Sequence, residues 1–121
     1  MEFESRQFAD VCVGAASGRI DHNSAPAFQA ALLAELEGAQ YSTLVLDLSG
    51  VDYMSSVGLR ALMVASKTAK PQGISIAVAA LTDTLAEIFE ISRFNMVFKT
   101  YDSVSDALGA VSAEALKSFN A

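Results

Sequence analysis

Residues 43–48, with the sequence TLVLDL, constrain the fold of this chain more than any other segment. Leucine and β-branched side chains dominate this run, which is typical of a strand covered on both faces. Ser49 and Gly50 follow it and are expected to end the strand. A strand buried on both faces requires helices on both sides of its sheet, so the run favours an α/β fold.

The rest of the chain alternates strands with helical segments and contains no internal repeat. Strands are predicted at residues 3–8, 11–16, 43–48, 74–79 and 97–99. The first two are expected to pair through a turn near Ala9 and Asp10, which gives an antiparallel edge hairpin. The order β-β-α-β-α-β-α-β-α implies right-handed crossovers and a mixed, mostly parallel sheet covered by about four helices.

Capping residues and helix breakers predict where the four helices begin and end. The first helix is expected to start at Asn23 or Ser24, with Pro26 in its first turn, and to end at Gly38. The second is expected to start at the Ser55–Ser56 pair and to stop before Pro71, the third to start at a capping box of Thr84 and Glu87, and the last to start at Ser103 with Asp106. From Ser112 onward the last helix is expected to continue or to fray.

The composition fits one globular domain. Of 121 residues, 52% are hydrophobic and 18% are charged, so the chain can fill a core and disorder is not expected. We predict a single domain over residues 1–121, with its core at about 3–111 and a tail at 112–121.

Several functions are excluded on chemical grounds. The net charge of −6 and the lack of a basic run argue against nucleic-acid binding. No apolar stretch approaches about 20 residues, and the polar N-terminus is unlike a signal peptide, so we expect a cytoplasmic protein without membrane insertion. Cys12 is expected to be a buried strand residue in a reducing compartment.

We expect this protein to have neither catalytic activity nor a bound metal or cofactor. With one cysteine and one histidine, His22, no metal site or cofactor is expected. The chain has no G-x-S-x-G elbow and no phosphate-binding loop. Adjacent Asp21 and His22 could not easily orient one another in a triad with Ser56, so no catalytic residue is assigned.

Two segments resemble the STAS domain family. They are residues 47–59, DLSGVDYMSSVGL, and residues 18–25, GRIDHNSA, which follow two neighbouring predicted strands. The resemblance covers nearly the whole chain, and the best-known members of the family are anti-sigma factor antagonists. It implies a protein-binding switch that sequesters an anti-sigma factor kinase while a serine at the start of the second helix is unphosphorylated, with a phosphatase that resets it.

The matching acceptor is Ser56, and Ser55 is a second candidate. Many relatives carry aspartate where this chain has Ser55, and often serine where it has Val57. Taken alone, a serine pair before a helix is more often a cap than a phosphorylation site, and one serine can cap while the other is modified. A phosphate is tolerated at a helix start, yet its charge of about −1.5 to −2 would weaken binding at an interface there.

The partner-binding residues are expected around this helix start. They are Asp21, Asn23, Ser55, Ser56, Val57, Gly58, Arg60 and Val64. Asp21 is either a partner contact beside Ser56 or an Asx-turn residue. Gly58 either packs against the sheet or leaves room for a partner. Val57, Arg60, Ala61, Val64 and Lys67 form a candidate docking patch, unless they pack against a neighbouring helix.

A second function remains open at this stage. STAS-like domains also serve as subunits of lipid-trafficking ABC transporters and as stressosome-type scaffolds, neither of which requires a phosphorylation switch. The small acidic chain is expected to be a monomer or a weak dimer.

Overall fold

The computed structural model describes all residues from 1 to 121 and contains one five-stranded sheet in the order β1-β2-β3-β4-β5. β1 and β2 pair antiparallel, and every other neighbouring pair is parallel. The strands are β1 Glu2–Phe8, β2 Val11–Ile20, β3 Thr43–Met54, β4 Ser75–Ala79 and β5 Lys99–Tyr101. The predicted mixed sheet with an antiparallel edge hairpin is therefore confirmed.

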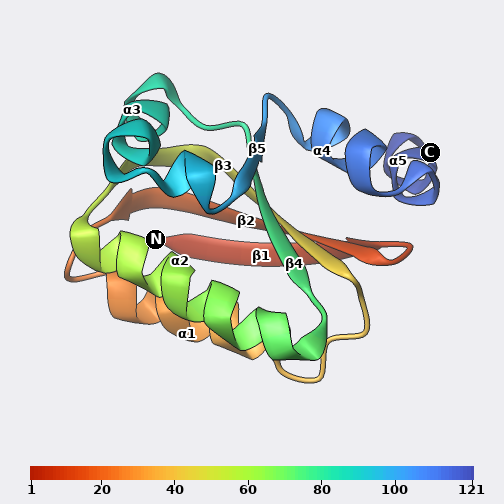
Figure 1. Cartoon of the computed structure of the whole chain (residues 1–121), viewed down its shortest axis with the longest axis horizontal. Coiled ribbons are helices and arrows are strands. Elements are labelled where there is room, and N and C mark those ends of the chain that lie inside the picture. Colours follow the sequence, from red (N-terminus) through yellow and green to blue (C-terminus); the bar gives the residue numbers. More distant parts are fainter.

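Helices cover both faces of this sheet. They are α1 Ala25–Leu36, α2 Ser56–Ala69, α3 Asp83–Ser92, α4 Val104–Val111 and α5 Ala113–Asn120, with two short 3-10 helices, η1 Lys70–Gln72 and η2 Phe94–Met96. α1 and α2 lie side by side on one face, while α3, α4 and α5 lie on the other (Figure 1). The larger core cluster packs α1 and α2 onto the sheet, and a smaller one lies under α4 and α5.

Two strands run further than the sequence predicts. β2 extends past Ala16 to Ile20, and β3 extends through Ser49 and Gly50 to Met54. The β2–β3 ladder continues with two register shifts, so local break signals are overridden by strand pairing. Gly50 fits because the strands approach closely there: a Cβ at this position would lie 2.9 Å from the Ser17 Cβ.

The third helix begins earlier than predicted. Its cap is Thr82, whose hydroxyl accepts from the Leu85 N–H at 3.2 Å and donates to the Val51 carbonyl at 3.2 Å. The Thr84–Glu87 capping box was wrong, because this contact with β3 fixes the chain two residues upstream. The fifth strand is also shifted to Lys99–Tyr101, since η2 occupies residues 94–96.

The C-terminal residues form a fifth helix rather than a continuation of the fourth. Ser103 starts α4 as predicted, by accepting from the Asp106 N–H at 3.0 Å. Ser112 then interrupts it with an extended conformation and caps α5. The Ser112 hydroxyl also donates to Asp10 Oδ1 at 2.9 Å, and Phe119 packs edge-on against Phe8 with ring centroids 5.3 Å apart. α5 is thereby attached to the hairpin formed by β1 and β2.

Candidate functional site

The start of α2 is joined to the end of β2. The Ser55 N–H donates to the Ile20 carbonyl at 2.8 Å, and Ile20 is the ladder partner of Met54. Residues 21–24, which link β2 to α1, therefore lie next to the first turn of α2 (Figure 1). The two segments that carry the sequence motifs meet at this end of the sheet, as strand ends in α/β folds do.

Ser55 and Ser56 have different surroundings. Ser55 is the N-cap of α2, and its Oγ accepts from the Gly58 N–H at 3.3 Å. Ser56 is the first helical residue, is exposed, and its hydroxyl makes no hydrogen bond within the protein. The backbone N–H groups of Ser56 and Val57 also have no acceptor in the chain. A free hydroxyl therefore lies beside two free donors at the positive end of the helix.

Asp21 organises the neighbouring turn. Its Oδ1 accepts from the N–H groups of Asn23 at 3.0 Å and Ser24 at 3.2 Å, while Oδ2 lies 3.5 Å from Arg19 Nε. Partial burial acts to raise the pKa of Asp21, but these backbone hydrogen bonds outweigh it and hold the pKa below its ordinary value. Asp21 is thus an Asx-turn residue, and Asn23 remains exposed beside it.

Gly58 is buried at the contact between α2 and the sheet. A Cβ there would lie 2.6 Å from Met54 Cγ and 2.9 Å from Ile20 Cγ2. Only glycine allows the first turn of α2 to sit this close to the ends of β2 and β3. Of the two roles considered for Gly58, close packing is the one that the geometry supports.

Fewer residues of the candidate docking patch on α2 are exposed than predicted. Val57 is 41% exposed, Arg60 is exposed and Val64 is half-buried. Ala61 was wrongly placed in the docking patch, since it is buried, as are Leu62 and Ala65. α1 packs against α2, and small side chains such as alanine allow two helices to approach closely.

Arg19 lies at the same end of the sheet as the start of α2, and it was not among the predicted site residues. Its guanidinium lies 4.1 Å from the centre of the Tyr53 ring, a cation–π contact between the ends of β2 and β3. The two residues are ladder partners, which follows from a strand register that no sequence pattern revealed.

Outside this site, the remaining candidates for reactive or metal-binding groups are few. Cys12 is buried as predicted, and burial, aided by nearby Glu35, raises the pKa of its thiol to about 11. No group of three or more His, Cys, Asp or Glu side chains is arranged to hold a metal ion. None of the helices has both the length and the apolar character needed to cross a bilayer.

Comparison with known proteins agrees with this geometry. The STAS domain model matches residues 2–107. The inferred anti-sigma factor antagonist BtrV of Bordetella bronchiseptica is 30% identical over 93 residues, which are 77% of this chain and 79% of BtrV. An anti-sigma factor antagonist from Mycobacterium paratuberculosis has a similar structure, with a TM-score of 0.77, 27% identity, and coverage of 91% of this chain and 92% of that one.

A second solved structure shares the fold alone. It is the anti-sigma factor antagonist SpoIIAA in its unphosphorylated form, with a TM-score of 0.76, 14% identity, and coverage of 91% of this chain and 96% of that one. The sheet topology and the site together define an α/β domain in which the two motif segments meet at the start of a helix. The chain belongs to the STAS domain family.

Proposed function

We propose that this protein is an anti-sigma factor antagonist that binds an anti-sigma factor kinase, and that phosphorylation of Ser56 turns the binding off. The observation that carries the proposal is the division of roles between the two serines. Ser55 caps α2, so the helix start does not depend on Ser56, whose hydroxyl is exposed and free. The 30% identity to BtrV over most of both chains supports the same class of partner.

Phosphorylation of Ser56 would leave the fold intact. The phosphate would lie next to the free N–H groups of Ser56 and Val57, at the helix end that favours negative charge. It adds a charge of about −1.5 to −2 to an exposed surface. A partner that buries this surface would have to desolvate that charge, so affinity falls while stability is retained.

The binding face consists of the first turns of α2 and the turn at Asp21. Asn23, Ser56, Val57 and Arg60 are its exposed members, and Val64 lies at its margin. Asp21, Ser55 and Gly58 contribute by holding the backbone in place rather than by broad exposure. The protein acts as a cytoplasmic monomer or weak dimer, without enzymatic activity of its own, and a phosphatase restores Ser56.

The first experiment is capture of partners from the source cell by wild-type protein and by Ser56→Asp, read by mass spectrometry. An ATP-binding anti-sigma factor kinase bound by wild type and lost with Ser56→Asp is expected. Binding of that purified kinase is then measured for Ser56→Ala, Ser56→Asp and Ser118→Asp. The last adds the same charge on exposed α5 and should bind like wild type.

Phosphate mapping separates the two serines. Incubation with the kinase and ATP should phosphorylate Ser56 in the wild-type protein and in Ser55→Ala. In Ser56→Ala, no phosphate should be found at the start of α2. Equal kinase binding by Ser56→Asp and Ser56→Ala would overturn the gate. Capture of a transporter ATPase by both variants alike would instead assign the protein to lipid trafficking.

A further inference from the structure

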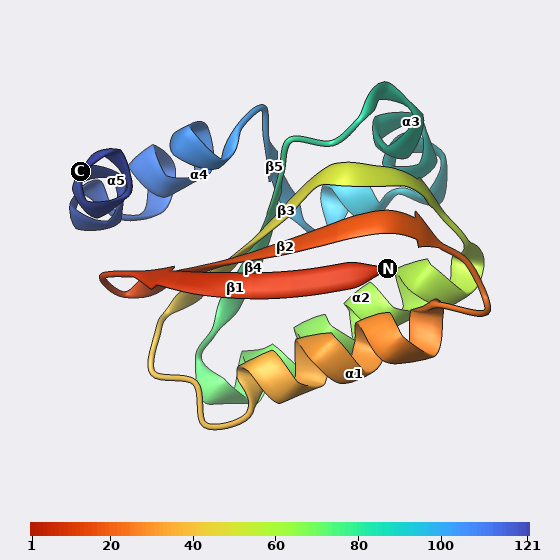
Figure 2. The same ribbon diagram turned by 180° about the vertical axis from the view of Figure 1, so that it is seen from behind.

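β1 is a long edge strand whose outer side is unpaired. It is the outermost strand of the sheet and pairs only with β2, over all seven of its residues. No backbone hydrogen bond outside that ladder involves residues 2–8. Figure 2 shows β1 in front of the sheet with α1 below it and no element over its outer edge. The free N–H and C=O groups of such an edge can pair with an added strand.

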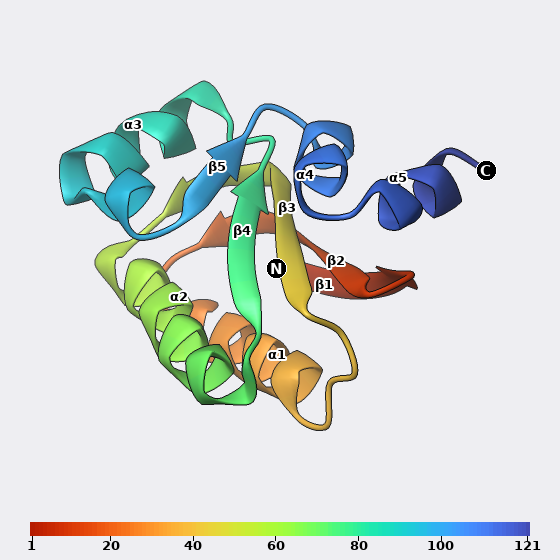
Figure 3. The ribbon, with the colours of Figure 1, turned by 45° about the vertical axis from the view of Figure 1, so that its right-hand side comes forward.

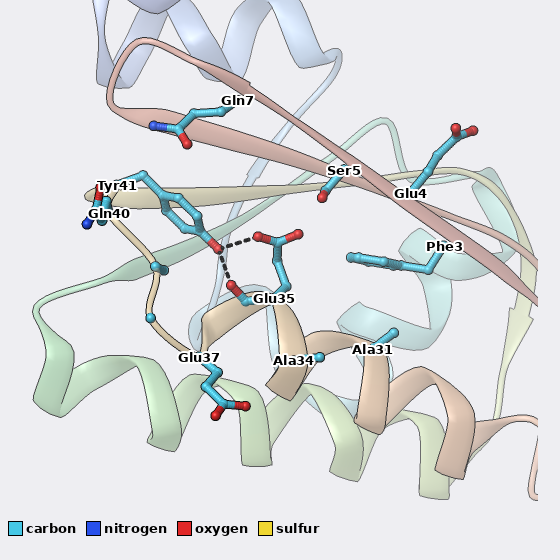
Figure 4. Close-up of a pocket in the computed structure, with 12 residues that line it drawn as sticks. Phe3, Glu4, Ser5, Gln7, Ala31, Ala34, Glu35, Glu37, Gln40 and Tyr41 are labelled. Atoms are coloured by element: carbon cyan, nitrogen blue, oxygen red, sulfur yellow. Dashed lines mark hydrogen bonds between the residues drawn. The ribbon is translucent and has the colours of Figure 1, made fainter.

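A hollow lies beneath this edge, on the side of α1. It measures about 620 Å³ and is lined by Phe3, Ser5, Ala31, Ala34, Glu35 and Tyr41, among others. In Figure 4 the Glu35 carboxylate projects from α1 into the space below β1, and the Phe3 and Ser5 side chains point toward α1. The lining is therefore mixed: apolar side chains such as Phe3 and Ala31 surround the Glu35 carboxylate, together with polar residues such as Ser5.

The Glu35 carboxylate has a neutral partner and no cation. Tyr41 Oη lies 3.0 Å from Glu35 Oε2 and 3.0 Å from the Glu35 carbonyl, so one phenol proton serves both oxygens. Burial, with the nearby Glu35 charge, raises the pKa of Tyr41, which stays a neutral donor. The only ion pair of the molecule is Arg19–Asp21, so Glu37, which also lines this hollow, has no cationic partner either. Glu4 is in the lining too, but its carboxylate points away from α1 (Figure 4).

A second hollow lies on the opposite face of β1. It measures about 330 Å³, and its lining combines the apolar Phe8, Val13, Ala15 and Phe119 with the charged Glu4 and Arg6. Phe119 remains 39% exposed there, beside the hairpin. Successive side chains of an extended strand point to opposite faces of a sheet. α1 and α2 lie on one side of the sheet, and α4 and α5 lie on the other (Figure 3). A strand added to β1 would therefore place alternate side chains in the acidic hollow on the α1 side and in the more apolar hollow on the α5 side.

We propose that the β1 edge docks an extended segment of a partner protein in which basic and apolar residues alternate. Backbone hydrogen bonds to β1 supply the pairing, a lysine or arginine reaches Glu35 in the α1-side hollow, and apolar side chains enter the α5-side hollow. This surface is separate from the start of α2, so both could be occupied at once.

A second copy of the chain fits this edge less well. Antiparallel self-pairing centred on Ser5 would set Glu4 opposite the partner copy's arginine, but it would send Phe3, Ser5 and Gln7 to the acidic hollow. Glu35 would then stay without a cation, and two chains of net charge −6 would be brought together.

The test uses a fluorescein-labelled nine-residue peptide of alternating valine and lysine, with fluorescence anisotropy as the readout. A peptide of the same composition with its valines and lysines in two blocks is the control. Glu35→Gln, which keeps the acceptor for Tyr41, should weaken the alternating peptide about fivefold, as the loss of one ion pair predicts. Glu90→Gln on α3 removes the same charge from an exposed position and should have no such effect.

Two peptides methylated on alternate backbone nitrogens test the strand pairing itself. Only one of them should lose binding, because only one set of N–H groups faces β1. Amide resonances of residues 3–7 should shift on binding. Equal binding of block and alternating peptides, equal effects of Glu35→Gln and Glu90→Gln, or equal binding of both methylated peptides would overturn the proposal. A dimer of the free protein that Arg6→Glu dissociates would overturn it in favour of a second copy.

Discussion

Replacing Gly58 by alanine tests whether the start of α2 is set by close packing. Alanine is favoured over glycine inside a helix by about 1 kcal/mol. The added Cβ would lie 2.6 Å from Met54 Cγ and 2.9 Å from Ile20 Cγ2, and both residues are buried. Two such overlaps place the cost in the upper part of the usual overpacking range, about 2–3 kcal/mol. The net effect expected is a loss of about 1–2 kcal/mol of unfolding free energy.

Gly109 provides the matched control. It lies in α4, is exposed, and a Cβ there would meet only Leu116 Cδ2 at an ordinary 3.4 Å. Gly109→Ala should therefore gain up to about 1 kcal/mol from helix propensity alone. Urea unfolding of both variants and wild type measures the difference, with an expected fall in midpoint of roughly 0.5–1 M for Gly58→Ala. A stability gain in Gly58→Ala equal to that of Gly109→Ala would refute the packing argument.

Three further predictions follow from single contacts. Arg93 ends α3 in the left-handed conformation, with a φ of 63°, which is strained for a residue other than glycine. Arg93→Gly should therefore raise the unfolding free energy, measured by thermal unfolding, by about 0.5–1 kcal/mol. A lower unfolding free energy would contradict the idea that the backbone is strained at this position. Ser112→Ala removes the cap of α5 and the hydrogen bond to Asp10. It should lower the unfolding free energy by about 1 kcal/mol and speed amide hydrogen exchange only in residues 113–120. Unchanged exchange rates in these residues would contradict the prediction. Asp21 has a pKa held below 3.8, so the stability that it contributes is present above that value and is lost as pH falls through the lower folded pKa. NMR titration of the Asn23 and Ser24 amides should give a midpoint below 3.8, absent in Asp21→Asn, and a higher midpoint would contradict the hydrogen-bonded turn.

The architecture was predictable because its signals are local. A buried strand at residues 43–48 and caps such as Ser55 and Ser103 depend on neighbours a few positions away, and both caps accept from the residue three positions on. The antiparallel pairing of β1 and β2 follows from a short turn between two strands. The alternation of strands and helices then left a mixed sheet as the consistent arrangement.

The same local reasoning failed where distant segments compete with local signals. Ser49 and Gly50 read as a strand end, yet β3 continues because β2 pairs with it as far as Ile20 and Met54. Thr84 had the capping spacing, but Thr82 takes the cap because its hydroxyl also reaches Val51 on β3. Ala61 lay on the expected outer side of α2 but is buried in the larger core cluster.

The candidate site combines both kinds of information. The residue types at the start of α2 came from the sequence, and so did the hypothesis that one serine caps the helix while the other is modified. Which serine does which depends on a backbone bond from Ser55 to Ile20, 35 residues earlier, which fixes where the helix begins. The contact of Arg19 with Tyr53, the attachment of α5 to Asp10 and the hollows beside β1 also join residues far apart in the chain. Such contacts depend on strand register and helix packing, and these are set when the whole core closes rather than by any short stretch of sequence.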